Sequence, residues 1–523
     1  MSTSRFIQRF GDKITGVLSG YDRLVLRGSL LAIVFPEGMK RLLRLKDILL
    51  KDFGRWAENM TKQLKEASCR AARDQNRPIV YLKSASTDKD EVARKIAAKD
   101  GITTGLVAIL TCLEPCNSFD IHRNRQTHKL ELVKDMRKGL AVYHYWIDPQ
   151  LGWMNARIQS WLPFSIQVCI NGREWLAQML DKNGIGYRRY DNCFTSIDDI
   201  AKAQRLMDRQ LRISWPQALE RIQRQLNPLH GRMFRGLGLS YYWSIYQSEW
   251  ATDVMFRNAS DLQAIYPAMV LHGMRTFSSE DVLRFLGRRV PLHGNFKGEV
   301  TSDFKDRAEG VRIKHRVKNN SIKAYDKGGI VRNVLRVETT MNDPRDFKVL
   351  RKKHGQSKGK PQWRPLRRGV ADVHRRAQVS QAANESYLDA LAATDTSTPL
   401  GELIRDICKP TTYRNKRVRA LRPWADPDLA LLRAINRGEF AVNGFRNRDL
   451  QSLLFDHAAD SDEEKRRRSA RVSRLLRMLR AHHLIQKVPH THRYVLTNRG
   501  REIISAVVAS QQITLEQLNK LAA

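Results

Sequence analysis

The pattern of apolar and polar residues predicts a long series of strands and helices. Apolar runs rich in β-branched and aromatic residues, separated by polar, Gly or Pro residues, predict strands. These runs lie at 14–31, 77–84, 104–115, 129–136, 139–148 and 153–171. Apolar positions that recur every three or four residues predict helices. Those segments are 40–73, 90–99, 171–184 and 197–211. The prediction is an α+β fold, in which a large mixed α/β body has a mainly antiparallel sheet.

The aromatic-rich segment 241–257 carries two acids, Glu249 and Asp253, four residues apart. On a helix this spacing places both carboxylates on one face. Such a pair is a candidate site for a divalent metal ion. The alternative is that both acids form salt bridges with some of the many arginines.

A second polar constellation lies in the segment 319–338, which reads as two strands joined by a tight turn. In a hairpin, Lys323, Tyr325 and Lys327 share one face of the first strand, and Arg336 and Glu338 share one face of the second. A tyrosine flanked by cations, near a carboxylate able to hold a metal, suits phosphodiester cleavage through a phosphotyrosine intermediate. The alternative is a tyrosine stacked on a sheet beside a structural cross-strand Arg–Glu pair.

The C-terminal segment has the element order of a winged helix-turn-helix. Helices are predicted at 429–436 and 446–455, and a third at 466–482 is followed by a short hairpin and a last helix. The third helix has the arrangement of a recognition helix, with an apolar stripe inward and arginines outward. The residues expected to meet nucleic acid are Arg468, Arg471, Arg474 and Arg477 on this helix, with His492 and Arg493 at the tip of the wing.

Shifts in composition divide the chain into four expected regions. The first is an α/β region at 1–130, and the second is an α+β catalytic or nucleic-acid-binding region at 131–350. A basic linker with helices at 351–426 then leads to the winged helix at 427–523.

The charge of the chain identifies the class of partner. Its 92 Lys and Arg residues against 54 Asp and Glu residues give a formal charge of +38. A polyanion is therefore expected, and DNA is favoured: double-stranded, with a single-stranded or hairpin portion, while RNA is the other candidate. No run of 18 apolar residues and no signal stretch occurs, so a membrane partner is not expected. Six scattered cysteines favour a reducing cytoplasm.

Two resemblances extend this interpretation. The run SIKAYDK followed by LRVE is similar to the tyrosine region of rolling-circle replication initiators from plasmids and filamentous phages. The resemblance implies that Tyr325 attacks a DNA phosphodiester, that Lys323 and Lys327 contact phosphate, that Glu338 binds Mg²⁺ or Mn²⁺, and that Arg336 orients phosphate or Glu338. Glu249 and Asp253 are the further metal ligands expected.

The segment after residue 427 resembles the winged-helix domains of bacterial regulators of the MarR type. The chain has neither a His-hydrophobe-His motif nor a Gly-x4-Gly-Lys-Ser/Thr motif. Two hypotheses therefore stand: a metal-dependent DNA nicking and strand-transfer enzyme, or a non-catalytic DNA-binding regulator or RNA-binding protein.

Overall fold

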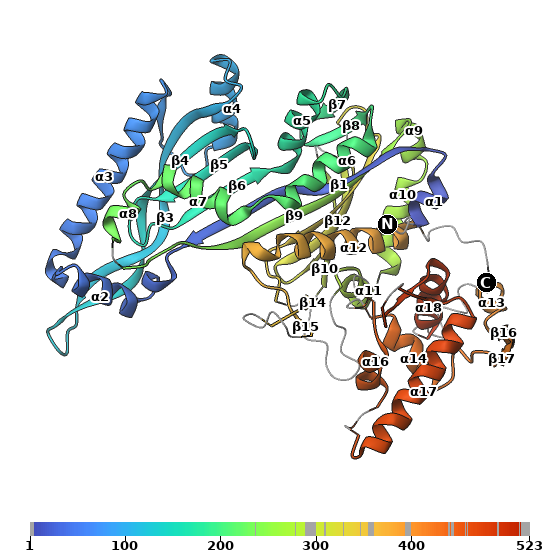
Figure 1. Cartoon of the computed structure of the whole chain (residues 1–523). Helices are drawn as coiled ribbons and strands as arrows, with labels where there is room; N and C mark the ends of the chain where they lie inside the picture. Colours follow the sequence, from blue (N-terminus) through green and yellow to red (C-terminus); the bar gives the residue numbers. More distant parts are fainter. Residues whose placement is uncertain are drawn as a thin grey trace.

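The computed structural model has a mixed α and β fold built on one large sheet (Figure 1). It describes residues 5–513, with gaps at 236, 278, 288–299, 308–309, 328, 346, 354–359, 393–398, 438–439, 441–443, 456, 458, 489–490 and 512. The sheet contains 11 strands, in the order β10-β11-β12-β13-β9-β1-β6-β5-β4-β3-β2. Every pair of neighbours is antiparallel except β2 and β3. The predicted mainly antiparallel sheet is confirmed.

The strands of the sheet fall into two halves with the same order, apart from β2, which is an additional edge strand of the first half. The first half comprises β1 (Ile14–Ser29), β2 (Ile79–Leu82), β3 (Gly105–Arg123), β4 (Leu130–Asp148), β5 (Gly152–Gln159) and β6 (Ile166–Asn171). The second half comprises β9 (Tyr242–Phe256), β10 (Val300–Arg307), β11 (Gly310–Val317), β12 (Asn320–Lys327) and β13 (Val334–Met341).

In each half a first strand is followed by helices and then by a meander of four strands, the last of which pairs with the first strand. The two first strands, β1 and β9, pair with each other at the centre. The two halves of the sheet are therefore an internal structural repeat.

Helices and short hairpins surround this sheet. The helices of the body are α1 (Arg5–Phe10), α2 (Pro36–Leu45), α3 (Phe53–Asp74), α4 (Lys89–Lys99), α5 (Gly172–Lys182), α6 (Ile200–Asp208), α7 (Trp215–Leu226), α8 (His230–Met233), α9 (Ala259–Gln263), α10 (Tyr266–Thr276), α11 (Ser279–Phe285) and α12 (Val373–Leu391). The hairpins are β7 (Tyr187–Tyr190) with β8 (Cys193–Ile197), β14 (Lys348–Arg351) with β15 (Gln362–Pro365), and β16 (Thr411–Tyr413) with β17 (Lys416–Val418).

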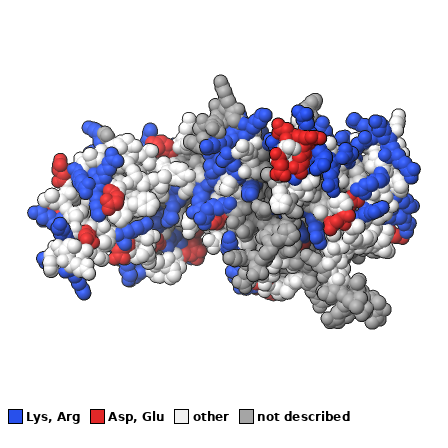
Figure 2. Space-filling model, turned by 90° about the horizontal axis from the view of Figure 1, so that it is seen from below, with Lys and Arg blue, Asp and Glu red and all other residues white. Residues whose placement is uncertain are grey.

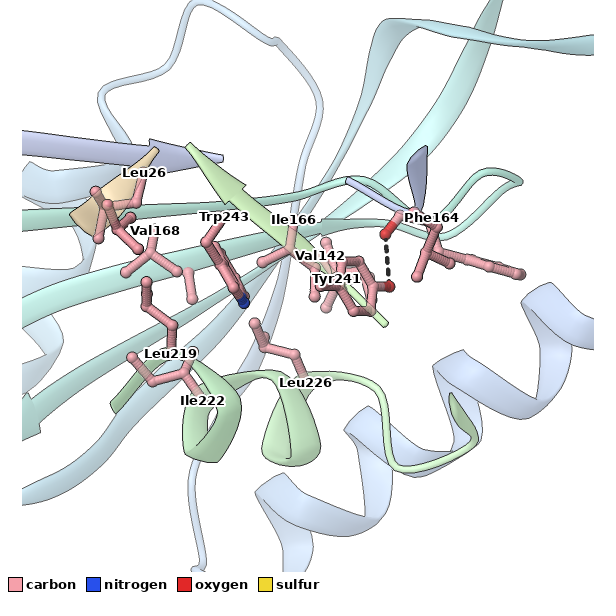
Figure 3. Packing of buried hydrophobic residues seen from close by; sticks show 14 of the residues in the cluster. Leu26, Val142, Phe164, Ile166, Val168, Leu219, Ile222, Leu226, Tyr241 and Trp243 are labelled. Carbon is pink, nitrogen blue, oxygen red and sulfur yellow. Dashed lines mark hydrogen bonds between the residues drawn. The ribbon is translucent and has the colours of Figure 1, made fainter. Parts of the chain in front are cut away.

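One face of the sheet carries the main hydrophobic cores. Helices α3 and α7 pack on the first half, α10 packs on the second half, and α12 contributes to both cores. Helix α7 shows the pattern, because its apolar residues at helical spacing all face the strands (Figure 3). The side chains drawn there include Leu219, Ile222 and Leu226, and the Tyr241 hydroxyl nearby donates a hydrogen bond of 2.8 Å to the Phe164 carbonyl.

The other face of the sheet is only partly covered. Helix α4 packs on β2 and β3, and α5 and α6 with the β7–β8 hairpin pack on the centre. In Figure 1, α12 and α6 lie on opposite sides of the central strands. Within the described residues, no helix covers this face over β11, β12 and the adjoining parts of β13 and β9.

The C-terminal unit has a core of its own. It comprises α13 (Leu400–Ile404), α14 (Asp428–Ile435), α16 (Asn447–Leu454), α17 (Asp462–Ala481), β18 (Ile485–Lys487), β19 (Tyr494–Leu496) and α18 (Asn498–Ser510). This core also contains residues of α13 and of the β16–β17 hairpin, so it begins before the expected boundary at 427.

Three expectations differ from the structure. The segment 241–257, considered as a helix, is strand β9, which pairs with both β1 and β13. Strands β3 and β4 pair along their whole length, so the sheet runs through the expected boundary at residue 130. Helix α12, expected in a linker region, packs in the cores of the body because one of its faces is apolar.

Candidate functional site

The predicted hairpin brings three of the five expected side chains, Lys323, Tyr325 and Glu338, into contact. Strands β12 and β13 pair so that Lys323 lies opposite Glu338 and Tyr325 lies opposite Arg336. The Lys323 ammonium is 2.8 Å from one oxygen of Glu338, and the Tyr325 hydroxyl is 3.3 Å from the other. Alternation along both strands directs these side chains to the partly covered face of the sheet.

Arg336 is the centre of a buried ion cluster. It donates two hydrogen bonds to Asp253, of 2.5 and 2.8 Å, and its third nitrogen lies 3.4 Å from Asp22. Arg173, from the first turn of α5, is 3.1 Å from Asp253. Burial would raise the pKa of Asp253, but Arg336 and then Arg173 hold it below its ordinary value.

This cluster corrects two expected roles. Asp253, expected as a metal ligand, has both oxygens bonded to guanidinium groups and serves as the partner of Arg336. Arg336 is directed at Asp253 and Asp22, and at the carbonyl oxygen of Asn192, so it does not orient Glu338.

Two glutamates converge on Asp22 beside this cluster. Ligand oxygens of Asp22, Glu249 and Glu338 lie within 4.8 Å of one another. They come from three strands that are adjacent or next-adjacent in the sheet, β1, β9 and β13. Oxygen ligands of this kind suit Mg²⁺ or Mn²⁺. Asp22 therefore takes the place expected for Asp253.

We call Asp22, Glu249 and Glu338 the acidic cluster. The pKa values of its two glutamates are shifted in opposite directions. Burial raises the pKa of Glu249, and the charge of Glu338 raises it further. Burial also acts to raise the pKa of Glu338, but the charge and hydrogen bond of Lys323 more than offset it and lower the pKa. Glu338 is therefore ionised first, and added positive charge near Glu249 would stabilise its ionised form.

Tyr325 and Lys327 of the predicted motif are buried. Tyr325 is 4% exposed, and burial, followed by the charge of Glu338, raises the pKa of its hydroxyl well above the ordinary value. The ammonium groups of Lys323 and Lys327 lie 5.5 and 5.8 Å from the centre of its ring. Lys327 is bonded to Asn192 and lies 3.4 Å from Asp191, both at the turn of the β7–β8 hairpin. It is thus held away from the surface expected to contact phosphate.

Sequence reasoning missed the partners that come from other parts of the chain. Asn192 donates from its amide nitrogen to both oxygens of Asp22, at 2.8 and 2.9 Å. Asp22 was detectable, because it is the one acid in strand β1 and lies among apolar residues. Arg173 and Asn192 have no such signal in the sequence.

The expected nucleic-acid contacts of the C-terminal unit divide into two groups. On α17, Arg471, Arg474 and Arg477 are exposed. Arg468 is instead bonded to Glu464 at 2.9 Å, and its guanidinium lies 4.9 Å from the centre of the Phe455 ring. On the hairpin after α17, His492 is exposed and Arg493 is buried, which corrects the expectation of a free Arg493 at the tip.

The face of the molecule that is seen from below is rich in basic side chains. Figure 2 shows the molecule from below, and far more of the side chains coloured there are Lys and Arg than Asp and Glu. None of the helices described has the length and apolar character that a membrane span requires.

Comparison of the chain with protein-family models, with curated proteins and with solved structures gave no match.

Proposed function

We propose that this chain binds DNA and nicks it in a metal-dependent transesterification, with Tyr325 as the nucleophile. The observation that carries the proposal is the convergence of Asp22, Glu249 and Glu338 beside the Tyr325 hydroxyl, in a chain of charge +38. Asp22, Glu249 and Glu338 would hold Mg²⁺ or Mn²⁺. Burial, followed by the charge of Glu338, raises the pKa of Glu249, and the charge of a bound divalent ion would offset both effects.

The chemistry proposed is a transfer of one phosphodiester bond. The Tyr325 oxygen attacks the phosphorus, the bond from phosphorus to one sugar oxygen breaks, and a phosphotyrosine and a free sugar hydroxyl result. The proton of Tyr325 passes to Glu338, whose oxygen lies 3.3 Å away, and from Glu338 to the leaving sugar oxygen. A bound divalent ion supplies positive charge to the phosphate oxygens and to the developing phenolate.

A second candidate function is binding without catalysis. It is favoured by the burial of Tyr325 and by the complete pairing of Arg336, both of which are also properties of a structural ion network. In that case the basic body and the C-terminal unit would bind nucleic acid as a regulator or an RNA-binding protein.

The first test is a covalent adduct. Purified protein is incubated with supercoiled DNA and Mg²⁺ or Mn²⁺, and adducts are resolved in denaturing gels. We expect an adduct with the native chain and none with Tyr325→Phe, because this change removes only the nucleophilic oxygen. DNA binding by the variant should stay nearly unchanged.

The matched control for this test is Tyr190→Phe. Tyr190 is 48% exposed and lies in the β7–β8 hairpin, whose Asn192 holds Asp22. If Tyr190→Phe abolishes the adduct and Tyr325→Phe does not, the nucleophile is misassigned. If the native chain forms no adduct with either metal, the non-catalytic function is the better one.

We propose further that the C-terminal unit is a winged helix-turn-helix that binds duplex DNA through α17. Its order of three helices, hairpin and helix supports this, as does the bridge from Phe445 to Tyr494, which adds a third extended segment to the hairpin.

The corresponding prediction concerns Arg471 and Arg474 in the full chain. Replacing both by Ala should reduce the slope of log affinity for duplex DNA against log salt by about 1.8, since each phosphate contact contributes about 0.9. The control is Lys62→Ala with Lys65→Ala on α3, two exposed cations on a helix of the body. A slope that both pairs of substitutions leave unchanged would contradict the assignment of α17.

A further inference from the structure

A row of cations lies on the uncovered part of the sheet, beside the acidic cluster. On β11, Arg312, Lys314 and Arg316 alternate with buried residues and so point to this face. Arg312 and Arg316 share one oxygen of Asp303, at 3.8 and 3.5 Å. Within the described part of the chain, Lys314 forms no ion pair at all.

The like charges of this row repel one another in the free protein. Lys314 lies directly opposite Lys323 on β12, and like charges in this position destabilise a sheet. Burial lowers the pKa of Lys314, and Lys323, Arg312 and Arg316 lower it further, which outweighs the opposite effect of Asp303 directly across from it on β10. A bound polyanion would relieve this repulsion, since each phosphate oxygen stabilises the charged form of the lysine.

The row continues across the acidic cluster to β1. Arg316 is in register with Ser321, then Thr340, then Glu249 and finally Arg23. Arg23 is 57% exposed and lies 4.0 Å from Glu249. The acidic cluster therefore has exposed cations on both sides.

An aromatic side chain lies just beyond Arg23 on the same face. Tyr246 on β9 is 53% exposed, and the guanidinium of Arg27 lies 5.3 Å from the centre of its ring. Arg27 shares its face with Arg23 because both are exposed at even spacing on β1. An exposed ring beside a cation is a platform on which a nucleic-acid base can stack.

We propose that one nucleic-acid strand crosses this face, with its phosphates on Lys314, Arg316 and Arg23 and one base stacked on Tyr246. A single strand is favoured because its bases are free to stack on an aromatic side chain, whereas those of a duplex are paired and stacked on each other. The inference rests on the proposed function for the identity of the polyanion. It places the strand directly over the acidic cluster.

The test is binding of a fluorescently labelled oligothymidylate to the full chain in EDTA, at several salt concentrations. Replacing Lys314 and Arg316 by Ala should lower the salt slope by about 1.4, from about 0.7 for each phosphate contact on a single strand. Tyr246→Ala should weaken binding roughly 5- to 100-fold with little change in slope, and Tyr246→Phe should bind like the native chain. The pair Lys62→Ala with Lys65→Ala is the control, because α3 packs on the opposite face of the sheet.

Three results would overturn the inference. These are a slope that the Lys314 and Arg316 changes leave as it is, equal affinity of Tyr246→Ala and Tyr246→Phe, or equal losses for a duplex of the same length. Because EDTA prevents metal-dependent cleavage, the test is separate from the adduct assay. If no adduct ever forms but these variants behave as expected, the nicking function fails and the strand-binding face stands.

Discussion

Arg336→Met is expected to destabilise the protein by about 3–5 kcal/mol, the usual cost of removing one partner from a buried ion pair. Arg336 is fully buried and bonded to Asp253 by two hydrogen bonds. Without Arg336, the carboxylates of Asp253 and Asp22 share the guanidinium of Arg173, which lies 3.1 Å from Asp253 and 3.9 Å from Asp22. The negative charge of the two carboxylates is then only partly balanced. Chemical denaturation followed by circular dichroism measures the change in the free energy of unfolding.

Two further variants make this prediction specific. Arg224→Met removes an exposed i,i+4 pair with Glu220 on α7 and should cost less than about 1 kcal/mol. In the double variant Arg336→Met with Asp253→Asn, the loss should be smaller than the sum of the two single losses, because no unpaired charge is left. Additive losses would show that Arg336 and Asp253 are not coupled.

The hairpin at 319–338 could be predicted because its chemistry is local. Period-2 alternation fixes which side chains share a face, and the short connection between the two strands, residues 328–333, favours their pairing. The contact of Lys323 and Tyr325 with Glu338 follows from these two facts. The same rules say nothing about what covers that face, so they left Lys327 exposed where the β7–β8 hairpin in fact buries it.

The segment around Glu249 shows why spacing alone did not identify a strand. Residues four apart share a face on a helix, where they are about one turn apart, and also on a strand, where four is a multiple of two. Glu249 and Asp253 are therefore on one side of β9 in either case. Only pairing with β1 and β13, which lie far away in sequence, decides between the two.

The acidic cluster could not be assembled from sequence for the same reason. Asp22 is separated from Glu338 by more than half of the chain, and the two meet because β1 and β13 both pair with β9. The repeat of the two halves places β1 and β9 side by side at the centre. This repeat is one of topology.

In metal-free buffer at neutral pH, Glu249→Gln should raise the melting temperature and Glu338→Gln should lower it. The pKa of Glu249 is raised in the folded state, by burial and by Glu338, so its ionised form opposes folding once the pH exceeds the unfolded value. The pKa of Glu338 is lowered, since Lys323 more than offsets burial, so its ionised form stabilises the fold. This second contribution is present above the unfolded pKa and is lost as the pH falls through the folded pKa.

In Mn²⁺ the native chain should have a higher melting temperature than Glu249→Gln, the reverse of the order expected in metal-free buffer. At a concentration of 100 Kd, a ligand that binds only the folded state stabilises it by about 2.7 kcal/mol. We expect the native chain to gain this stability and both glutamine variants to lose most of the gain, because each lacks one carboxylate of the cluster.

The control for both parts is Glu114→Gln, which changes an acid that is paired with Arg157 at 3.0 Å in the other half of the sheet. It should lower stability without altering the gain from Mn²⁺, because Glu114 is outside the acidic cluster. Melting curves in EDTA and in Mn²⁺, over a range of pH, measure both effects. An equal gain in stability from Mn²⁺ in the native chain and all three variants would contradict the proposed metal site. A loss of stability for Glu249→Gln in EDTA would show that Glu249 is held by attraction to Arg23 instead of being repelled by Glu338.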